Sequence, residues 1–183
     1  MQGKTELEEK TISSKQVFDG KLLKVFSDSI ELPNGKEATR EYIKHPGAVC
    51  VLPLTDDGFA IMVEQFRYPF HDVLLEVPAG KLEYGEDPSD GVKRELEEEC
   101  GVVADNIDYI GTTYTTVAFT DEKIHTYLAT GLKFVDSHPD DDEFLKVRKI
   151  KFSDLVDMVF NNQIKDSKTQ IAIIKTKYFL ENK

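Results

Sequence analysis

This sequence has no long apolar runs and few cysteines, which excludes two broad classes of protein. In its 183 residues no apolar run approaches the roughly 20 residues that a helix needs to cross a bilayer, so no membrane partner is expected. Two cysteines, Cys50 and Cys100, are too few for a disulfide framework, and both are more typical of small buried residues than of reactive thiols. The first ten residues are polar and acidic, unlike a signal peptide, so we expect a cytoplasmic protein.

Basic residues are also scarce. The chain has 23 Lys and Arg residues against 34 Asp and Glu residues, which gives a formal net charge of −11 at pH 7. A protein that binds nucleic acid usually carries a basic face, so nucleic acid is not expected as a partner. An acidic enzyme that acts on an anionic phosphate substrate needs local cations instead, either a bound metal or positioned arginines.

Internal repeats and low-complexity linkers are absent, and turn signals divide the chain into an N-terminal lobe and a main domain. Residues 17–32 and 37–44 are predicted as strands joined at Asn34-Gly35, a strong hairpin signal because both residue types tolerate positive φ. His45-Pro46-Gly47 then interrupts the chain. We therefore expect a lobe of N-terminal strands over 1–46 and a main domain over 47–183.

The main domain alternates predicted strands with helices, which indicates a layered α/β arrangement around a mixed sheet. Its strands are expected near residues 48–54, 59–66, 74–77, 107–116, 123–132 and 147–152. A first helix is predicted over 88–100. Two more follow the last strand, the first capped by Ser153 and the second by Ser167 with Gln170.

The helix predicted over 88–100 has clear boundaries and an unusual distribution of charge. Asp87 is a favourable N-cap, Pro88 suits the first helical position, and Gly101 can end the helix in the left-handed conformation. An apolar face recurs every fourth residue at Val92, Leu96 and Cys100. A second face carries Glu95, Glu98 and Glu99.

This carboxylate cluster is unfavourable unless a cation joins it. Like charges three or four residues apart repel by roughly 0.2–0.5 kcal/mol per pair on an exposed helix. The last turns of a helix also disfavour anions. A solvated acidic face is the simpler explanation of most charge runs. Here the glutamates crowd where a helix favours cations, and a hard divalent ion such as Mg²⁺ would remove the penalty.

The segment GKLEYGEDPSDGVKRELEEECGV, residues 80–102, resembles the box of the Nudix hydrolase family. That pattern is Gly, five residues, Glu, seven residues, Arg-Glu, an aliphatic residue, any residue, Glu-Glu, any residue, Gly and an aliphatic residue. Its fixed positions are filled here by Gly80, Glu86, Arg94, Glu95, Leu96, Glu98, Glu99, Gly101 and Val102. The resemblance implies an α+β fold, a Nudix-type α/β/α sandwich around a mixed sheet, with the N-terminal antiparallel strand lobe beside it.

The resemblance also implies roles for the residues of the box. Glu95 and Glu99 correspond to the principal ligands of Mg²⁺, with Mn²⁺ as an alternative metal. Glu98 corresponds to a further ligand or catalytic support, and the carbonyl of Ala79 can complete the site. Arg94 corresponds to the arginine that orients the glutamates. The glutamate at position 86 corresponds to the one that braces the preceding loop against the helix.

Segments on both sides of the box resemble the ADP-ribose pyrophosphatase branch of this family. They are EQFRYPFHDVLLEVPAGKLE, residues 64–83, and IKDSKTQIAIIKTKYF, residues 164–179. Arg67 corresponds to an arginine that contacts the substrate. Arg40 corresponds to another, although an ordinary surface arginine of a strand has the same appearance. Arginine suits a pyrophosphate because its planar fork donates two hydrogen bonds.

The loop after the box resembles the same branch but departs from it at one place. Glu122 corresponds to the glutamate that acts on the attacking water, with Asp121 as the alternative, and both could also be acids of a surface loop. The branch has Ser-Pro-Gly where this chain has Thr116-Val117-Ala118. Because that proline marks a preference for ADP-ribose, its absence leaves hydrolysis expected but the substrate less defined.

The sequence therefore predicts a Mg²⁺-dependent hydrolase that cuts the pyrophosphate bond of ADP-ribose or a related nucleoside diphosphate sugar. The expected products are AMP and a sugar phosphate, and a homodimer is the expected assembly. Two alternatives stay open: a hydrolase of nucleoside triphosphates or dinucleotides, and a non-catalytic module that binds a nucleotide sugar. The complete set of box glutamates favours an enzyme over a binding module.

Overall fold

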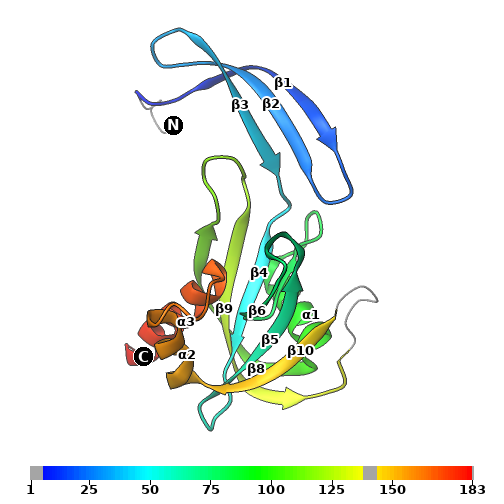
Figure 1. Ribbon diagram of the computed structural model, residues 1–183, viewed down its shortest axis with the longest axis vertical. Coiled ribbons are helices and arrows are strands. Elements are labelled where there is room, and N and C mark those ends of the chain that lie inside the picture. The colour runs from blue at the N-terminus through cyan, green and yellow to red at the C-terminus, as the bar shows by residue number, and fades with distance from the viewer. Residues whose placement is uncertain (1–5, 138–143, 183) are drawn as a thin grey trace. The chain divides into compact units, whose positions relative to one another are not determined.

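The computed structural model describes residues 6–137 and 144–182, which form three β-sheets and three α-helices (Figure 1). The chain divides into two compact units, Met1–His45 with Tyr114–Glu122 and Pro46–Thr113 with Lys123–Lys183. Among the described residues, no helix has the length and apolarity that crossing a membrane requires.

The smaller unit is built on an antiparallel sheet of three strands, β1 (Lys10–Asp19), β2 (Lys24–Glu31) and β3 (Glu37–Lys44). The prediction of one strand over 17–32 was wrong, because the chain turns where the Gly20 amide donates to the Leu23 carbonyl at 3.0 Å. Every residue of β1 is exposed, so its sequence carries no regular apolar alternation that would have revealed it.

The hairpin between β2 and β3 uses Asn34-Gly35 differently from the sequence prediction. Gly35 has a φ of 80° and its amide donates to the Leu32 carbonyl at 2.8 Å. Asn34 contributes its side chain, whose Oδ1 accepts from the Lys36 amide at 3.1 Å. Only the glycine therefore uses the left-handed region in this turn.

The larger unit is a three-layer α/β/α sandwich, as predicted. One sheet has the order β7-β4-β9-β8 and is mixed, because β4 runs parallel to β9 and antiparallel to β7. A second sheet has the order β10-β5-β6. The strands are β4 (Ala48–Pro53), β5 (Phe59–Arg67), β6 (Asp72–Glu76), β7 (Ala79–Lys81), β8 (Val102–Tyr114), β9 (Lys123–Phe134) and β10 (Leu145–Lys151). The helices are α1 (Pro88–Cys100), α2 (Phe152–Phe160) and α3 (Ser167–Glu181), with a 3₁₀ turn at Tyr68–Phe70.

Helices cover both faces of these sheets, with α1 on one side and α2 and α3 on the other (Figure 1). Strand β4 shows why its sequence is a continuous apolar run. Val49 and Val51 belong to the core on the α1 side, whereas Cys50 and Leu52 belong to the core shared with α2 and α3. Alternate side chains of a strand point to opposite faces, so a strand buried on both faces must be apolar throughout.

The caps of the helices agree with the sequence in α1 and differ in the other two. Asp87 caps α1, accepting from the Ser89 amide at 2.8 Å, and Gly101 ends it with a φ of 59°. The cap of α3 is Asp166 rather than the predicted Ser167, which is the first helical residue. Helix α2 begins after Lys151 without a side-chain cap, so the predicted role of Ser153 was also wrong.

Candidate active site

Helix α1 turns two of its glutamates toward the protein interior. Glu95 is 7% exposed and Glu99 is 4% exposed, although both are ionisable. The side chain of Glu98 is 38% exposed and lies at the rim of the group. Buried carboxylates are costly unless cations or hydrogen-bond donors surround them. The partners of these residues therefore decide what the group can do.

Arg94 is the central partner. Its Nη1 donates to Glu95 Oε1 at 2.7 Å and to Glu98 Oε2 at 2.9 Å, and its Nε donates to Glu86 Oε1 at 3.1 Å. Hydrogen bonds to Glu86, opposed by burial, and the charge of Glu95 raise the pKa of Arg94 above its ordinary value. This one guanidinium thus relieves much of the repulsion among the carboxylates.

Glu86 braces the loop that precedes α1. Its Oε2 accepts from the Glu83 amide at 2.8 Å, while its Oε1 accepts from Arg94. The hydrogen bonds from Arg94 and from the Glu83 amide lower the pKa of Glu86. A single carboxylate therefore joins the loop to the arginine that holds the helix glutamates.

Strand β7 brings the backbone against both buried carboxylates. The amide of Ala79 donates to Glu99 Oε2 at 3.0 Å. A Cβ atom built on Gly80 would lie 1.8 Å from Oε1 of Glu95. Position 80 must therefore lack a side chain for the Glu95 carboxylate to lie where it does.

The residues around α1 fit a divalent cation in their chemistry. Carboxylate and carbonyl oxygens are the ligands that Mg²⁺ and similar hard ions prefer. Buried Glu95 and Glu99 lie against the backbone of Ala79 and Gly80. Within residues 6–137 and 144–182, however, no three His, Cys, Asp or Glu side chains are grouped as ligands for one ion. Glu95 and Glu98 are instead turned toward Arg94.

Arg67, at the end of β5, belongs to the same unit as these glutamates. It makes a bidentate pair with Glu76, with both nitrogen–oxygen distances at 2.7 Å. The hydrogen bonds to Glu76 raise the pKa of Arg67 against the effect of burial, and the charges of Asp166 and Glu99 add to the rise. The carboxylates around Arg67 therefore favour its charged form.

The remaining predicted residues lie in the smaller unit. Arg40 pairs with Glu9, its Nε donating to Glu9 Oε2 at 2.9 Å. Glu122 accepts from Thr115 Oγ1 at 2.8 Å and has an oxygen 3.7 Å from His45 Nε2. Asp121 is committed to the backbone, because its Oδ1 accepts from the His45 amide at 2.8 Å.

Sequence reasoning missed Glu76, which is 2% exposed and lies between Arg67 and Lys168. The signal that could have revealed it is a lone carboxylate in the apolar stretch LLEVPA, residues 74–79. A charge in such a stretch implies a buried partner. Gly91 was also overlooked: a Cβ there would lie 2.6 Å from Leu82 Cδ2, so α1 packs closely at that point.

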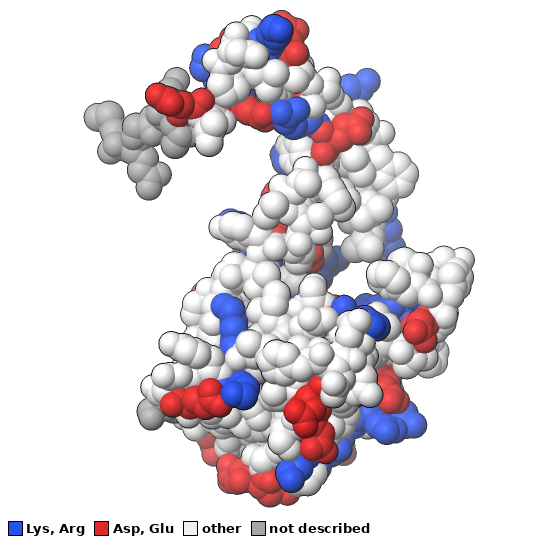
Figure 2. Space-filling view, turned by 60° about the vertical axis from the view of Figure 1, so that its left-hand side comes forward, with Lys and Arg blue, Asp and Glu red and all other residues white. Residues whose placement is uncertain are grey.

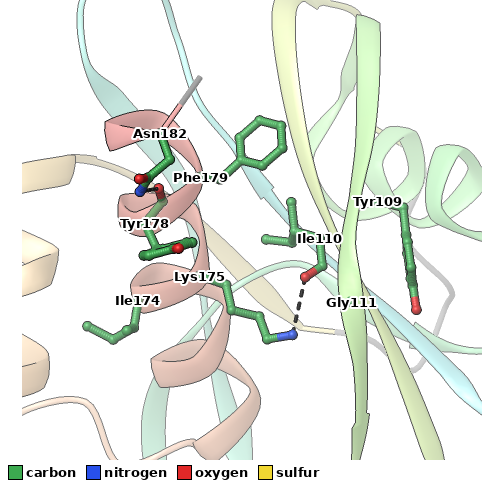
Figure 3. Close-up of a pocket in the computed structure, with 8 residues that line it drawn as sticks. All are labelled: Tyr109, Ile110, Gly111, Ile174, Lys175, Tyr178, Phe179 and Asn182. Atoms are coloured by element: carbon green, nitrogen blue, oxygen red, sulfur yellow. Dashed lines mark hydrogen bonds between the residues drawn. The ribbon is translucent and has the colours of Figure 1, made fainter.

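A groove of about 860 Å³ between β8 and α3 contains none of these residues (Figure 3). It is lined by Tyr109, Ile110, Gly111, Ile174, Lys175, Tyr178, Phe179 and Asn182. Among these lining residues Lys175 alone is charged, and it donates to the Ile110 carbonyl at 3.2 Å. Such an apolar groove is poorly suited to an anionic phosphate substrate.

The surface charge has no broad basic area on the face that Figure 2 draws, where acidic and basic side chains are interspersed among the residues it colours. The net charge of −11 likewise offers no overall positive field. Local cations such as Arg67 and Arg94 therefore matter more for an anionic ligand than the overall field does.

Comparison with protein families matches two adjoining segments. Residues 44–171 match the NUDIX domain. Residues 9–43 match the nucleoside diphosphate sugar hydrolase N-terminal domain. The boundary between the two matches falls next to His45-Pro46-Gly47.

Individual proteins resemble the chain over nearly its whole length. An ADP-ribose pyrophosphatase of Bacillus subtilis is 45% identical over 169 residues, covering 91% of each chain. A methanol dehydrogenase activator of Bacillus methanolicus is 41% identical over 168 residues, again covering 91% of each. A crystal structure of an ADP compounds hydrolase superposes with a TM-score of 0.86 at 18% identity, covering 98% of both chains, and supports the fold.

Proposed function

Because this chain belongs to the NUDIX family and is a pyrophosphohydrolase of that family, we propose that it hydrolyses the pyrophosphate bond of ADP-ribose or a related nucleoside diphosphate sugar. One observation carries the proposal: Glu95 and Glu99 are buried carboxylates held against β7, and Glu95 also pairs with Arg94. The N-terminal segment that matches a nucleoside diphosphate sugar hydrolase domain supports this substrate class.

Enzymes of this family generally depend on a divalent metal, and we propose Mg²⁺, with Mn²⁺ as the alternative. Glu95 and Glu99 would hold it, together with Glu98 and the carbonyl of Ala79. When bound, such an ion neutralises phosphate charge and lowers the pKa of a coordinated water. Arg94 would keep the carboxylates apart and oriented, since it contacts both Glu95 and Glu98.

Arg67 is proposed to bind the diphosphate of the substrate. Its Nε and Nη2 are engaged by Glu76, and no acceptor among the described residues bonds its Nη1. An N–H of this guanidinium can therefore donate to a phosphate oxygen. Arg40 is proposed as a second contact, for which it would have to release Glu9.

Glu122 is proposed as the general base. Its carboxylate would accept a proton from the attacking water as the new P–O bond forms and the bridging P–O bond breaks. The departing phosphate takes the electrons of the broken bond. With ADP-ribose the products are AMP and ribose 5-phosphate. Asp121 is the weaker choice because its side chain holds the His45 amide.

The test is a product-resolved screen in the presence of Mg²⁺. ADP-ribose, ADP-glucose, a dinucleotide and a nucleoside triphosphate are each incubated with the enzyme, and the products are separated. We expect AMP with ribose 5-phosphate from ADP-ribose, and loss of turnover in Glu99→Gln with the fold retained. Turnover of the triphosphate alone would overturn the substrate class, and binding of ADP-ribose without turnover would indicate a non-catalytic module.

We also propose that the protein is a homodimer assembled through the sheet of the smaller unit. Strand β1 is exposed throughout and carries large apolar side chains, Ile12, Val17 and Phe18. Exposed apolar side chains on a sheet edge favour association with another chain. A two-fold dimer is the commonest closed assembly.

A further inference from the structure

Glu76 is a carboxylate enclosed by two cations. It is 2% exposed at the end of β6, where both of its oxygens bond Arg67 and one also bonds Lys168. Burial alone would raise the pKa of Glu76, but the hydrogen bonds and charges of Arg67 and Lys168 outweigh it and lower the pKa. The three groups therefore form one ionised network.

The first turn of α3 anchors this network. The side chain of Lys168 is only 14% exposed, and its Nζ lies 3.1 Å from Oδ2 of Asp166, the cap of the helix. The next residue, Thr169, accepts from the Val77 amide at 2.9 Å and donates to Asp166 Oδ2 at 2.6 Å. Helix α3 thus holds both the side chain of residue 76 and the backbone of residue 77.

The network fixes Arg67 but leaves one nitrogen of its guanidinium for another ligand. A bidentate pair with a carboxylate sets the plane of a guanidinium as well as its position. That plane is set here by a partner that is itself held in place, since Glu76 is buried and also bonds Lys168. Nη1 of Arg67 has no hydrogen-bond partner in the part of the chain that the structure describes, and 38% of the side chain is exposed.

We propose that Glu76 and Lys168 are positioning residues that hold Arg67 ready for the diphosphate, with α3 as their support. This inference rests on the proposed function, in which Arg67 binds the substrate. It gives the segment Asp166-Ser167-Lys168-Thr169 a role in substrate binding, although none of its residues is proposed to touch substrate.

A purely structural ion pair is the competing explanation, and a double-mutant cycle separates the two. The variants are Arg67→Ala, Lys168→Met, Arg67→Ala/Lys168→Met and the conservative Lys168→Arg. The matched control is Lys177→Met, on the same helix, because Lys177 pairs with exposed Glu181. For each, kcat and KM for ADP-ribose are measured with Mg²⁺, together with the melting temperature.

We expect Arg67→Ala to raise KM by about tenfold or more, and Lys168→Met by about fivefold, with smaller changes in kcat. Lys168→Met should add little to KM once Arg67 is absent, since it acts through that residue. Lys168→Arg should restore most of the affinity, and Lys177→Met should leave both constants unchanged. Because Lys168→Met leaves Glu76 buried with one cation fewer, Glu76→Gln/Lys168→Met provides a neutral version in case the single variant folds poorly.

Each result decides the proposal. The proposal would be overturned if Lys168→Met raised KM by the same factor with and without Arg67. It would also be overturned if Lys168→Met lowered the melting temperature and left KM unchanged. A raised KM in a well-folded Glu76→Gln/Lys168→Met variant supports it. An unchanged KM in Arg67→Ala would instead show that the substrate role of Arg67 is wrong, which is a failure of the proposed function.

Discussion

Gly80 is required by the carboxylate that it faces. Its backbone has no positive φ, unlike that of Gly85 and Gly101. Any Cβ at position 80 would overlap the carboxylate of Glu95, because this Cβ would lie 1.8 Å from both Cδ and Oε1 of Glu95. The atoms that would have to move are the end of a flexible side chain, so a substitution at position 80 should displace the Glu95 carboxylate rather than the backbone.

This contact predicts a separation of activity from stability. Gly80→Ala should push the Glu95 carboxylate aside and lower kcat/KM by about tenfold or more, because metal ligands tolerate little displacement. The melting temperature should fall less than in Gly101→Ala, whose Cβ would meet the Val135 carbonyl at 2.5 Å. Gly85→Ala is the control: it has a φ of 85° and no neighbour within 4 Å, so it should strain the loop and keep its activity. Full activity in Gly80→Ala would remove Glu95 from the metal site.

Glu122 and Asp121 are adjacent carboxylates with different partners, so they should differ in mutagenesis. Glu122→Gln should lower kcat by roughly a hundredfold, the lower end of the usual contribution of a general base. Its Mg²⁺ dependence should stay the same, since we place it outside the metal ligands. Asp121→Asn should mainly lower the melting temperature, because its carboxylate accepts from the His45 amide. A loss of Mg²⁺ affinity in Glu122→Gln, with kcat preserved, would make Glu122 a ligand instead.

At the level of elements, local sequence signals predicted helix α1 and the box. Contacts between residues far apart in the chain determine features such as the position of Arg67. The ends of α1 follow from Asp87, Pro88 and Gly101, which act within one turn. The position of Arg67 could not be derived in the same way, because its partner Glu76 is itself held by Lys168, which is about a hundred residues away from Arg67 in the chain and lies on α3. Nor could β1 be found, since a fully exposed strand lacks the period-two pattern.

The network joining β5, β6 and α3 predicts a specific pH dependence of stability. The pKa of Glu76 is lowered from its ordinary value of 4.5 in the folded protein. Its contribution to stability is therefore complete above that pH and is lost as the pH falls through the lower folded pKa. Glu76→Gln should cost about 3 kcal/mol of unfolding free energy at pH 7. This difference from the wild type should shrink below pH 4.5. Denaturant unfolding at several pH values measures it, and a difference that widens in acid would show that Glu76 is not held ionised.

For the whole molecule, the exposed sheet of the smaller unit predicts a dimer in solution. Sedimentation should give twice the mass of the 20.8 kDa chain. Ile12→Glu/Phe18→Glu should shift the protein toward the monomer and weaken substrate binding, because buried charges oppose association. The control Phe160→Glu alters an exposed aromatic of α2 and should leave the dimer intact. Deleting residues 1–46 should give a monomer or an unstable protein. A full-length chain that sediments as a monomer at working concentrations would refute the dimer.

Substrate choice is the other property of the whole molecule, and the loop before Glu122 bears on it. This loop forms its turn without proline or glycine: the amides of Phe119 and Thr120 donate to the Thr116 carbonyl at 3.1 and 3.2 Å. It is joined to β3, where the Ile43 amide donates to the Phe119 carbonyl at 2.9 Å. Val117 is exposed at its tip. Proline fixes φ, and glycine reaches conformations that alanine avoids, so a Ser-Pro-Gly loop would follow a different path.

We therefore predict hydrolysis of ADP-ribose with less discrimination against other ADP-sugars than a Ser-Pro-Gly loop would provide. The measurement is kcat/KM for ADP-ribose, ADP-glucose and a nucleoside triphosphate, because the ratio of these constants defines specificity. Replacing Thr116-Val117-Ala118 by Ser-Pro-Gly should increase the preference for ADP-ribose over ADP-glucose, while Glu99→Gln in either background should remove turnover. A preference for ADP-ribose over ADP-glucose of a hundredfold or more in the unaltered enzyme, about 2.7 kcal/mol, would show that the altered loop costs no selectivity. The same preference for the triphosphate would overturn the substrate class, since the rate would then favour a chain of phosphates over a diphosphate joined to two sugars.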